Sequence, residues 1–258
     1  MAPGGLIAVV TGAAQGLGRG FSEILLQNSV KVALLDANEA AGARVKEVFD
    51  KQFGSDKTLF LKCDVQSEEQ LRVAFQKTKE TFGQLDIVCN NAGIIDEKNW
   101  EKAVSVNLLG TVRGTYIALE HMNRHTGGQG GVVINVSSMA GLGPILSSPV
   151  YTATKHAVVG FTRAMAASSS VSGYGVRFNV LCPAFTQTDM LNALRSPERA
   201  GQFSHLVDAA QTLTEKFGIL SVSEVAKSFL QLVTDETKNG EALMIHGKGS
   251  QYVSFPSL

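Results

Sequence analysis

The sequence predicts one α/β domain built on a doubly wound parallel sheet of about seven strands, with helices on both faces. Short apolar runs rich in β-branched residues, such as LIAVV (Leu6 to Val10) and VRFNVLCP (Val176 to Pro183), are typical of strands buried on both faces. Stretches with helical spacing separate successive runs, which indicates repeated βα units. The 258 residues, 44% of them hydrophobic, are enough for a single core over residues 1–258.

Composition and charge argue against several kinds of partner. The 23 basic and 23 acidic side chains cancel, so no net charge favours nucleic acid or an anionic membrane surface. We find no apolar run long enough to span a bilayer and no signal-peptide pattern. The histidines form no metal-ligand grouping, so we expect no metal site; they are His121, His125, His156, His205 and His246.

The three cysteines bear on the compartment. Cys63, Cys89 and Cys182 are widely spaced, and each lies at or near the end of an apolar run. This distribution is typical of free, mostly buried thiols in a reducing environment. We therefore expect a soluble cytoplasmic protein.

A glycine-rich turn follows the first strand. Residues 11–18, TGAAQGLG, place glycines at 12, 16 and 18, and a helical pattern follows. Glycine permits a tight turn and lets a pyrophosphate approach the N–H groups at a helix N-terminus. The order of strand, turn and helix predicts nucleotide binding at Gly12, Gly16 and Gly18.

The second strand, KVALLD, ends on Asp36, which is 18 positions after Gly18. A carboxylate there can accept hydrogen bonds from an adenosine ribose and would repel a 2′-phosphate. Gln15 and Ala37 are not basic, so the sequence favours NAD over NADP. The alternative is that Asp36 caps the helix that begins near Asn38.

Two more βα units follow. Residues 38–53 and 67–82 have helical patterns, and the strands TLFLKCDV and DIVCNNAG come after them. Asp64, at the end of the first of these strands, either meets an adenine amino group or is only a turn residue. Successive βα units predict a ligand crevice at the carboxyl ends of the strands. The second helix begins with a Ser-Glu-Glu capping signature, and its apolar face comprises Leu71, Ala74, Phe75 and Thr78.

The next helical stretch, residues 99 to about 124, contains Asn107. A mid-helix asparagine is normally solvated or mildly unfavourable, although a bent helix would aim it into a site. The strand GVVINVSS follows and ends in Ser137 and Ser138. The apolar stripe of the helix is predicted to comprise Val104, Leu108, Val112, Thr115 and Leu119.

The stretch Ser148 to Gly160, SPVYTATKHAVVG, holds Tyr151 and Lys155 four residues apart. On a helix this spacing puts both side chains on one face, where the ammonium favours phenolate and lowers the tyrosine pKa. Such a pair also occurs on ordinary helices. Ser138 lies thirteen residues before Tyr151, so the two hydroxyls can converge on one substrate oxygen.

The remaining elements are less clearly patterned. Small residues continue the helix after Lys155 and form either a subunit contact or simple core packing; they are Ala153, Ala157, Gly160, Ala164 and Ala167. Residues of about 185–220 are a candidate substrate lid. A helix at 222–235 and a seventh strand, EALMIHG, follow, and the remainder is expected to be a tail.

The chain resembles the short-chain dehydrogenase/reductase family over nearly its whole length. The resemblance lies in TGAAQGLG, Asp36, CDV, NNAG, Asn107, Ser138 and YTATK at these separations. It implies a Rossmann-like sheet and an NAD-dependent dehydrogenase. Within the family, PVYTATKH, GFTR and EKNWEK are most similar to the members that oxidise the 15-hydroxyl of prostaglandins with NAD.

The resemblance also implies individual roles. Tyr151 would be the catalytic acid/base, and Lys155 would lower its pKa and hold the nicotinamide ribose. Ser138 would bind the reacting oxygen, and Asn107 would hold a water of the proton relay. The cofactor would be bound by Gly12, Gln15, Gly16, Leu17, Gly18, Asp36, Cys63, Asp64, Val65, Asn91, Tyr151, Lys155, Thr186 and Thr188.

For the substrate side, the resemblance implies Ser138, Ser148, Tyr151, Phe185 and Phe217. Ser148 stands where the prostaglandin-oxidising members carry a glutamine, and Phe217 stands where mammalian members carry a tyrosine. The family's usual Pro-Gly is Pro-Ala at residues 183–184.

The implied function is oxidation of a secondary alcohol on a hydroxylated fatty acid, the 15-hydroxyl of prostaglandins and related eicosanoids. The alternatives are another lipid alcohol such as a hydroxysteroid and, in a different class, a non-catalytic NAD-binding regulatory protein. The expected partners are the lipid substrate and a second copy of the chain in a homodimer.

Overall fold

Eight strands form one continuous sheet in the computed structural model, which describes residues 5–256. Their order is β3-β2-β1-β4-β5-β6-β7-β8, and every neighbouring pair is parallel except β7 and β8. The predicted doubly wound α/β fold is confirmed. The strands are β1 (Ile7–Thr11), β2 (Lys31–Asp36), β3 (Thr58–Lys62), β4 (Ile87–Asn90), β5 (Gly131–Val136), β6 (Val176–Pro183), β7 (Ala242–His246) and β8 (Gly249–Tyr252).

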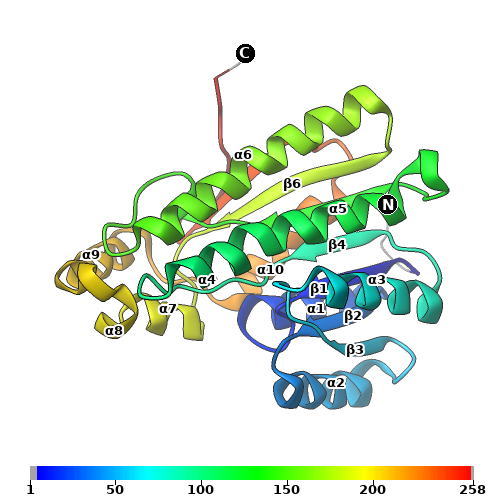
Figure 1. Cartoon of the computed structure of the whole chain (residues 1–258), viewed down its shortest axis with the longest axis horizontal. Coiled ribbons are helices and arrows are strands. Elements are labelled where there is room, and N and C mark those ends of the chain that lie inside the picture. The colour runs from blue at the N-terminus through cyan, green and yellow to red at the C-terminus, as the bar shows by residue number, and fades with distance from the viewer. Residues whose placement is uncertain (1–4, 257–258) are drawn as a thin grey trace.

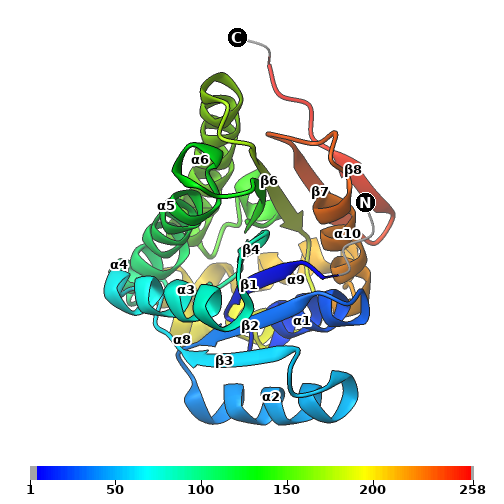
Figure 2. The same ribbon diagram turned by 90° about the vertical axis from the view of Figure 1, so that its right-hand side faces the viewer.

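Helices cover both faces of the sheet (Figures 1 and 2). One face carries α1 (Gly16–Gln27), α2 (Glu39–Phe53) and α10 (Val222–Thr234). The other carries α3 (Glu68–Phe82), α5 (Gly110–Met122) and α6 (Pro149–Ser172). Short single-turn 3-10 segments lie at η2 (Arg124–Thr126) and η3 (Met139–Gly141).

Strand β1 lies at the centre of this architecture. All its residues are buried, with Ala8 and Val10 packed in the core beneath α1 and α10, and Ile7 and Val9 in the core on the opposite face. It pairs with β2 on one side and β4 on the other, so the direction of strand progression reverses there. In open α/β sheets this switch point leaves a crevice at the carboxyl ends of the strands.

The candidate lid is built from short helices. They are α7 (Asp189–Leu194), α8 (Pro197–Ala200), η4 (Gly201–Leu206) and α9 (Val207–Phe217), which gather at one end of the molecule (Figure 1). The two ends of this segment are tied together, because Leu220 N–H donates to the Phe185 carbonyl at 2.8 Å and Gln187 N–H donates to the Leu220 carbonyl at 2.9 Å. The candidate lid therefore leaves the carboxyl end of β6 and returns beside it as a closed loop.

The expectation that a tail follows the seventh strand is wrong. After β7 the chain turns and β8 pairs antiparallel with it, with Leu243 opposite Tyr252. Its sequence, GSQY, has no apolar alternation, because an exposed edge strand buries little and needs no such pattern.

The stretch 99–124 is not one regular helix. It comprises α4 (Trp100–Val104), a π-helical turn η1 (Ser105–Leu109) and α5. Of the predicted stripe only Thr115 is fully buried; Val104, Leu108, Val112 and Leu119 are half-buried. Glycines face the sheet instead, since a Cβ at Gly114 would lie 2.2 Å from Asn90 Oδ1. The close approach of α5 to the sheet thus requires small residues, and a search for apolar side chains at helical spacing does not find them.

The small-residue face of α6 points outward. Ala153, Gly160, Ala164 and Ala167 are exposed, so the core-packing alternative for this face is wrong. All three cysteines are buried free thiols, as predicted. Within residues 5–256, none of the helices combines the length and apolar character that crossing a bilayer demands.

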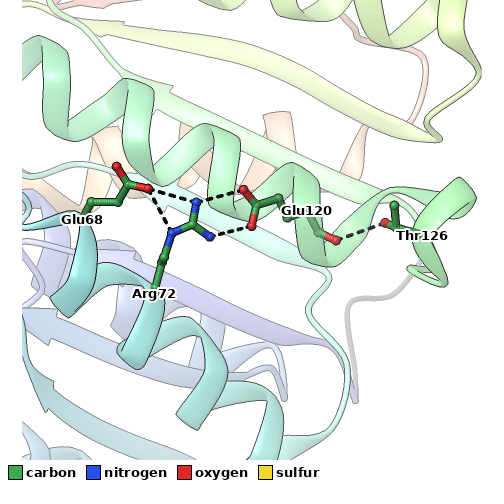
Figure 3. Close-up of polar contacts among 4 residues, drawn as sticks. All are labelled: Glu68, Arg72, Glu120 and Thr126. Carbon is green, nitrogen blue, oxygen red and sulfur yellow. Dashed lines mark hydrogen bonds and ion pairs between the residues drawn. The ribbon is translucent and has the colours of Figure 1, made fainter.

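On the surface away from the lid, α3 and α5 are joined by a charged contact (Figure 3). Arg72 Nη1 and Nη2 donate to both carboxylate oxygens of Glu120 at 2.7 and 3.1 Å, and its Nε donates to Glu68 at 2.9 Å. Because these side chains are about half exposed, solvent and salt screen the contact. It fixes register between two helices that the apolar core already holds.

Candidate active site

A cavity of about 410 Å³ opens at the carboxyl ends of β1, β2, β4, β5 and β6. Most of the residues predicted for the site line it, although they come from every part of the chain before residue 190. Those residues are Gly12, Gln15, Gly16, Leu17, Asp36, Cys63, Asp64, Val65, Asn91, Ser138, Tyr151, Lys155, Phe185, Thr186 and Thr188. Gly18, Asn107, Ser148 and Phe217 do not line it.

The glycine turn has the geometry that its spacing predicts. Gly12 and Gly16 have φ values of +63° and +51°, in the left-handed region that favours glycine. Gly18 lies behind the cavity wall, where a Cβ would stand 2.1 Å from the Gly12 carbonyl oxygen. Its role is therefore the close approach of α1 to the turn, while Gly12 and Gly16 shape the cavity.

Asp36 fixes the same turn from the neighbouring strand. One carboxylate oxygen accepts from Ala14 N–H at 2.9 Å, and the other accepts from Asn38 N–H at 2.8 Å. The α2 cap itself is Asn38, whose Oδ1 accepts from Ala41 N–H at 3.0 Å. The helix-cap alternative for Asp36 is thus wrong, and its carboxylate lines the cavity with lone pairs to spare.

Asn91 joins the ends of β1 and β4. Its Nδ2 donates to the carbonyls of Thr11 and Gly12 at 2.9 and 3.2 Å, and its N–H donates to Thr11 Oγ1 at 3.0 Å. These bonds hold the two sides of the switch point together, so the middle of the cavity has a fixed width.

Tyr151 and Lys155 lie on the first two turns of α6, and both are buried. The Tyr151 hydroxyl contacts Met190 Sδ at 3.8 Å, and Lys155 Nζ donates to the Val136 carbonyl at 2.9 Å. Ser138 Oγ accepts from Ala140 N–H at 3.1 Å, which orients the hydroxyl at the end of β5. Three of the four predicted catalytic side chains thus share one cavity.

Burial dominates the titration of this pair. It raises the pKa of the Tyr151 phenol to about 12 and lowers the pKa of the Lys155 ammonium to about 8, because both charged forms lose water. Lys155 Nζ lies 5.6 Å from the Tyr151 ring centre and donates to a backbone carbonyl. That Lys155 lowers the Tyr151 pKa stays a prediction.

Asn107 lies in the π-helical turn and is fully buried. Its Oδ1 accepts from Ile94 N–H at 2.8 Å, and its Nδ2 donates to the Ile94 carbonyl at 2.9 Å and to Thr154 Oγ1 at 3.3 Å. The bent helix therefore aims this side chain at the loop that walls the cavity, rather than into the cavity.

Ser148 and Phe217, predicted for the substrate side, do not line the cavity. Ser148 is buried at the N-terminus of α6, and Phe217 packs on the apolar core with its ring 6.4 Å from that of His246. Their substrate roles stay predictions.

The apolar wall near Tyr151 escaped the sequence analysis. It comprises Ile95, Ile145, Met190, Leu191 and Leu194, whose side chains pack in one apolar cluster with Phe185. The only signal was the spacing of Met190, Leu191 and Leu194, at i, i+1 and i+4 in TDMLNAL, which fits one face of a short helix. Among residues 5–256, no group of three or more His, Cys, Asp or Glu side chains is placed to hold a metal ion.

The fold and this site define a class of protein that sequence comparison identifies. A profile described as short chain dehydrogenase matches residues 6–199, and the chain belongs to that family. This confirms the family predicted from the motifs. The chain is 43% identical to 15-hydroxyprostaglandin dehydrogenase (NAD+) of Rattus norvegicus over 257 residues, which cover 98% of this chain and 97% of the relative.

Two further comparisons agree. The enzyme of the same name from Homo sapiens is 44% identical over 241 residues, which cover 93% of this chain and 91% of the relative. A short chain dehydrogenase/reductase from Burkholderia phymatum, solved in complex with NAD, superposes with a TM-score of 0.81 at 25% identity and covers 95% of this chain and 90% of its own.

Proposed function

We propose that this protein oxidises a secondary alcohol of a hydroxylated fatty acid to a ketone with NAD, the 15-hydroxyl of prostaglandins and related eicosanoids being the preferred substrate. One observation carries the proposal. A single cavity joins a polar half, lined by the glycine turn and Asp36, to an apolar half, with the Tyr151 hydroxyl at the boundary. Such a cavity suits a dinucleotide and a lipid alcohol side by side.

The residues present fit NAD. The glycine turn offers backbone close to a helix N-terminus, where a diphosphate is stabilised. Asp36 faces the cavity beside an uncharged Ala37, an arrangement that accepts ribose hydroxyls and disfavours a 2′-phosphate. The names of the relatives and the NAD complex of the structural neighbour support the same cofactor.

The chain's own residues supply the proton chemistry. As the phenolate, Tyr151 would accept the hydroxyl proton of the alcohol and become the neutral phenol, while Ser138 Oγ holds the same oxygen. Lys155 would hold the nicotinamide ribose. Asn107 keeps the Ile94 loop in place and would hold a water of the proton relay. When bound, NAD supplies the hydride acceptor and a positive charge that opposes the effect of burial on the Tyr151 pKa.

The apolar half supports a lipid substrate. Met190, Leu191 and Leu194 on α7 face Ile95 and Ile145 across the cavity. An aliphatic chain would bury its surface against these side chains, whereas a small polar alcohol would leave them exposed. The same apolar side chains would also bury the rings of a steroid. A comparison of substrates therefore decides between the two lipid classes.

The test is a panel of alcohols with NAD and NADP, followed through the absorbance of the reduced cofactor. We expect turnover of 15-hydroxyeicosanoids with NAD, less with NADP, and a rate about 10²- to 10⁴-fold lower for Tyr151→Phe. Faster oxidation of hydroxysteroids would replace the substrate proposal with its alternative. Tight NAD binding without oxidation of any alcohol would favour a regulatory NAD-binding protein.

We also propose a homodimer in the reducing cytoplasm. The exposed small residues of α6 lie near the exposed Tyr116 of α5, whose ring meets Phe161 of α6 at 5.8 Å. Flat, small-residue helix faces allow close packing between subunits. Light scattering of the purified protein tests this, and Gly160→Arg should shift the mass toward that of one chain.

A further inference from the structure

The helix that carries Tyr151 is capped by a residue far away in the sequence. Glu97, in the loop after β4, accepts from Val150 N–H at 3.0 Å with Oε2 and from Tyr151 N–H at 2.9 Å with Oε1. Its side chain is buried, with 9% of the residue exposed. One carboxylate therefore binds the backbone of the tyrosine itself and of the residue before it.

Local sequence leaves these two donors without another partner in the first turn of α6. Pro149, at the first helical position, has no N–H, and the Ser148 side chain makes no cap hydrogen bond. The ladder of α6 begins only with Thr152 N–H, which donates to the Ser148 carbonyl at 2.9 Å. The N-terminal donors of a buried helix need acceptors, and Glu97 supplies both while placing negative charge at the positive end of the helix.

Glu97 is itself held between the cavity wall and the lid. Its N–H donates to the Arg199 carbonyl of α8 at 2.8 Å, and Arg199 Nη1 donates to the Ile95 carbonyl at 3.4 Å. Ile94 and Ile95, just before Glu97, line the cavity, and Asn107 fixes Ile94. A continuous set of contacts thus joins lid, cavity wall and catalytic helix.

We propose that Glu97 is a positioning residue for Tyr151, setting where the tyrosine hydroxyl stands relative to the cavity wall. The inference rests on the proposed dehydrogenase function. Tyr151 lies in the first turn, so a small tilt of that turn moves its hydroxyl, whereas Lys155 one turn later is additionally held by the Val136 carbonyl. Glu97 touches no reacting atom and acts only through the backbone of α6.

The test is Glu97→Gln in the full chain, assayed with NAD and a secondary alcohol carrying hydrogen or deuterium at its carbinol carbon. Glutamine offers one acceptor oxygen where glutamate offers two, so one of the two N–H groups loses its partner. We expect kcat to fall about 10- to 100-fold. The KM for NAD should stay within about twofold. The deuterium isotope effect on kcat should rise, because a misplaced tyrosine makes the chemical step limiting.

Glu224→Gln is the matched control. Glu224 also serves a helix N-terminus, in the capping box of α10, where its Oε2 accepts from Ser221 N–H at 2.8 Å, but it lies outside the cavity. Its replacement should lower thermal stability without changing kcat or the isotope effect. If Glu97→Gln does not fold, Glu97→Asp, which keeps the charge on a shorter side chain, replaces it. Its kcat should fall less, its isotope effect should still rise, and its KM for NAD should stay unchanged.

Two results would overturn the inference. One is a kcat for the Glu97 variant equal to that of the wild type. The other is a loss of activity that follows the loss of folded protein with an unchanged isotope effect, which would make Glu97 a stabilising cap only. Absence of turnover in the wild-type protein would instead reject the proposed function on which the inference rests.

Discussion

The two halves of the cavity are built in different ways. The cofactor half consists of strand ends and turns whose polar groups are already bonded to one another, as Asp36 is to Ala14 and Asn91 is to Thr11 and Gly12. The half proposed for the substrate is an apolar wall on α7 and nearby loops, held by packing, in which Met190 Sδ lies 3.8 Å from the Tyr151 hydroxyl. Polar geometry therefore defines one ligand, and the shape of apolar side chains defines the other.

This difference predicts that substitutions in the two halves separate cleanly in their effects. Changes in the cofactor half should alter NAD affinity, because hydrogen bonds hold each polar group there in a single position. Changes in the substrate half should alter the alcohol preference, because apolar side chains can repack. The variants below test this separation.

Tyr151→Phe, at the boundary, should have the largest effect. Removing the hydroxyl removes the proton acceptor, and general acid/base groups contribute about 10²- to 10⁴-fold in rate. NAD affinity should change little, because the backbone of Tyr151 stays on α6. Steady-state oxidation rates and NAD titration of the same preparation measure both quantities. A loss of NAD affinity as large as the loss of rate would contradict the separation of the two halves.

Lys155→Met should stabilise the protein at neutral pH while lowering activity. Burial lowers the Lys155 pKa from 10.5 to about 8, so the folded protein pays for a buried charge below pH 8, and this cost disappears as pH rises toward 10.5. The stability of the variant relative to wild type should therefore fall by roughly 3 kcal/mol over that interval. Urea unfolding at pH 7 and pH 10.5 measures the difference, and a pH-independent difference would contradict the assigned burial effect.

Asp36→Asn tests the cofactor half directly. The amide oxygen can keep the Ala14 N–H bond, but the negative charge toward the ribose is lost. Hydrogen bonds to charged groups contribute roughly 1.5–3 kcal/mol, so NAD affinity should fall about 10- to 100-fold, and discrimination against NADP should weaken. Titration with both cofactors is the measurement. An unchanged ratio of the two affinities would mean that Asp36 serves only to hold the glycine turn.

The same contrast explains which parts of the molecule were readable from sequence. Gly12, Gly16, Asp36 and Asn91 each lie at or shortly after the carboxyl end of a strand. A parallel sheet brings all these strand ends to one edge, so sequence order alone indicated that they meet. Tyr151 and Lys155 were readable because helical spacing fixes their relation.

Other features depend on packing that no spacing encodes. The bonds of Glu97 to Val150 and Tyr151 cross 53 and 54 positions, and strand β8 has no apolar alternation. The rise of the Tyr151 pKa comes from burial, which the charge pattern of the sequence does not show. The buried position of Gly114 could not be predicted, because a helix that packs on a sheet through glycine lacks the apolar stripe that marks a buried face.

Met190→Ala should have the smallest effect and is the sharpest test of the separation. The thioether contacts the Tyr151 hydroxyl, and its truncation widens the apolar half without touching a residue that binds the glycine turn or Asp36. One or a few methylene-sized groups in an apolar pocket are worth about tenfold or somewhat more in selectivity between substrates. We therefore expect the ratio of kcat/KM values for long-chain and bulkier alcohols to shift by up to about tenfold toward the bulkier ones, with NAD affinity unchanged. Competition assays with paired alcohols give that ratio. A change in NAD affinity of the same size would show that α7 belongs to both halves, and the two ligands would then have to be explained by one coupled cavity.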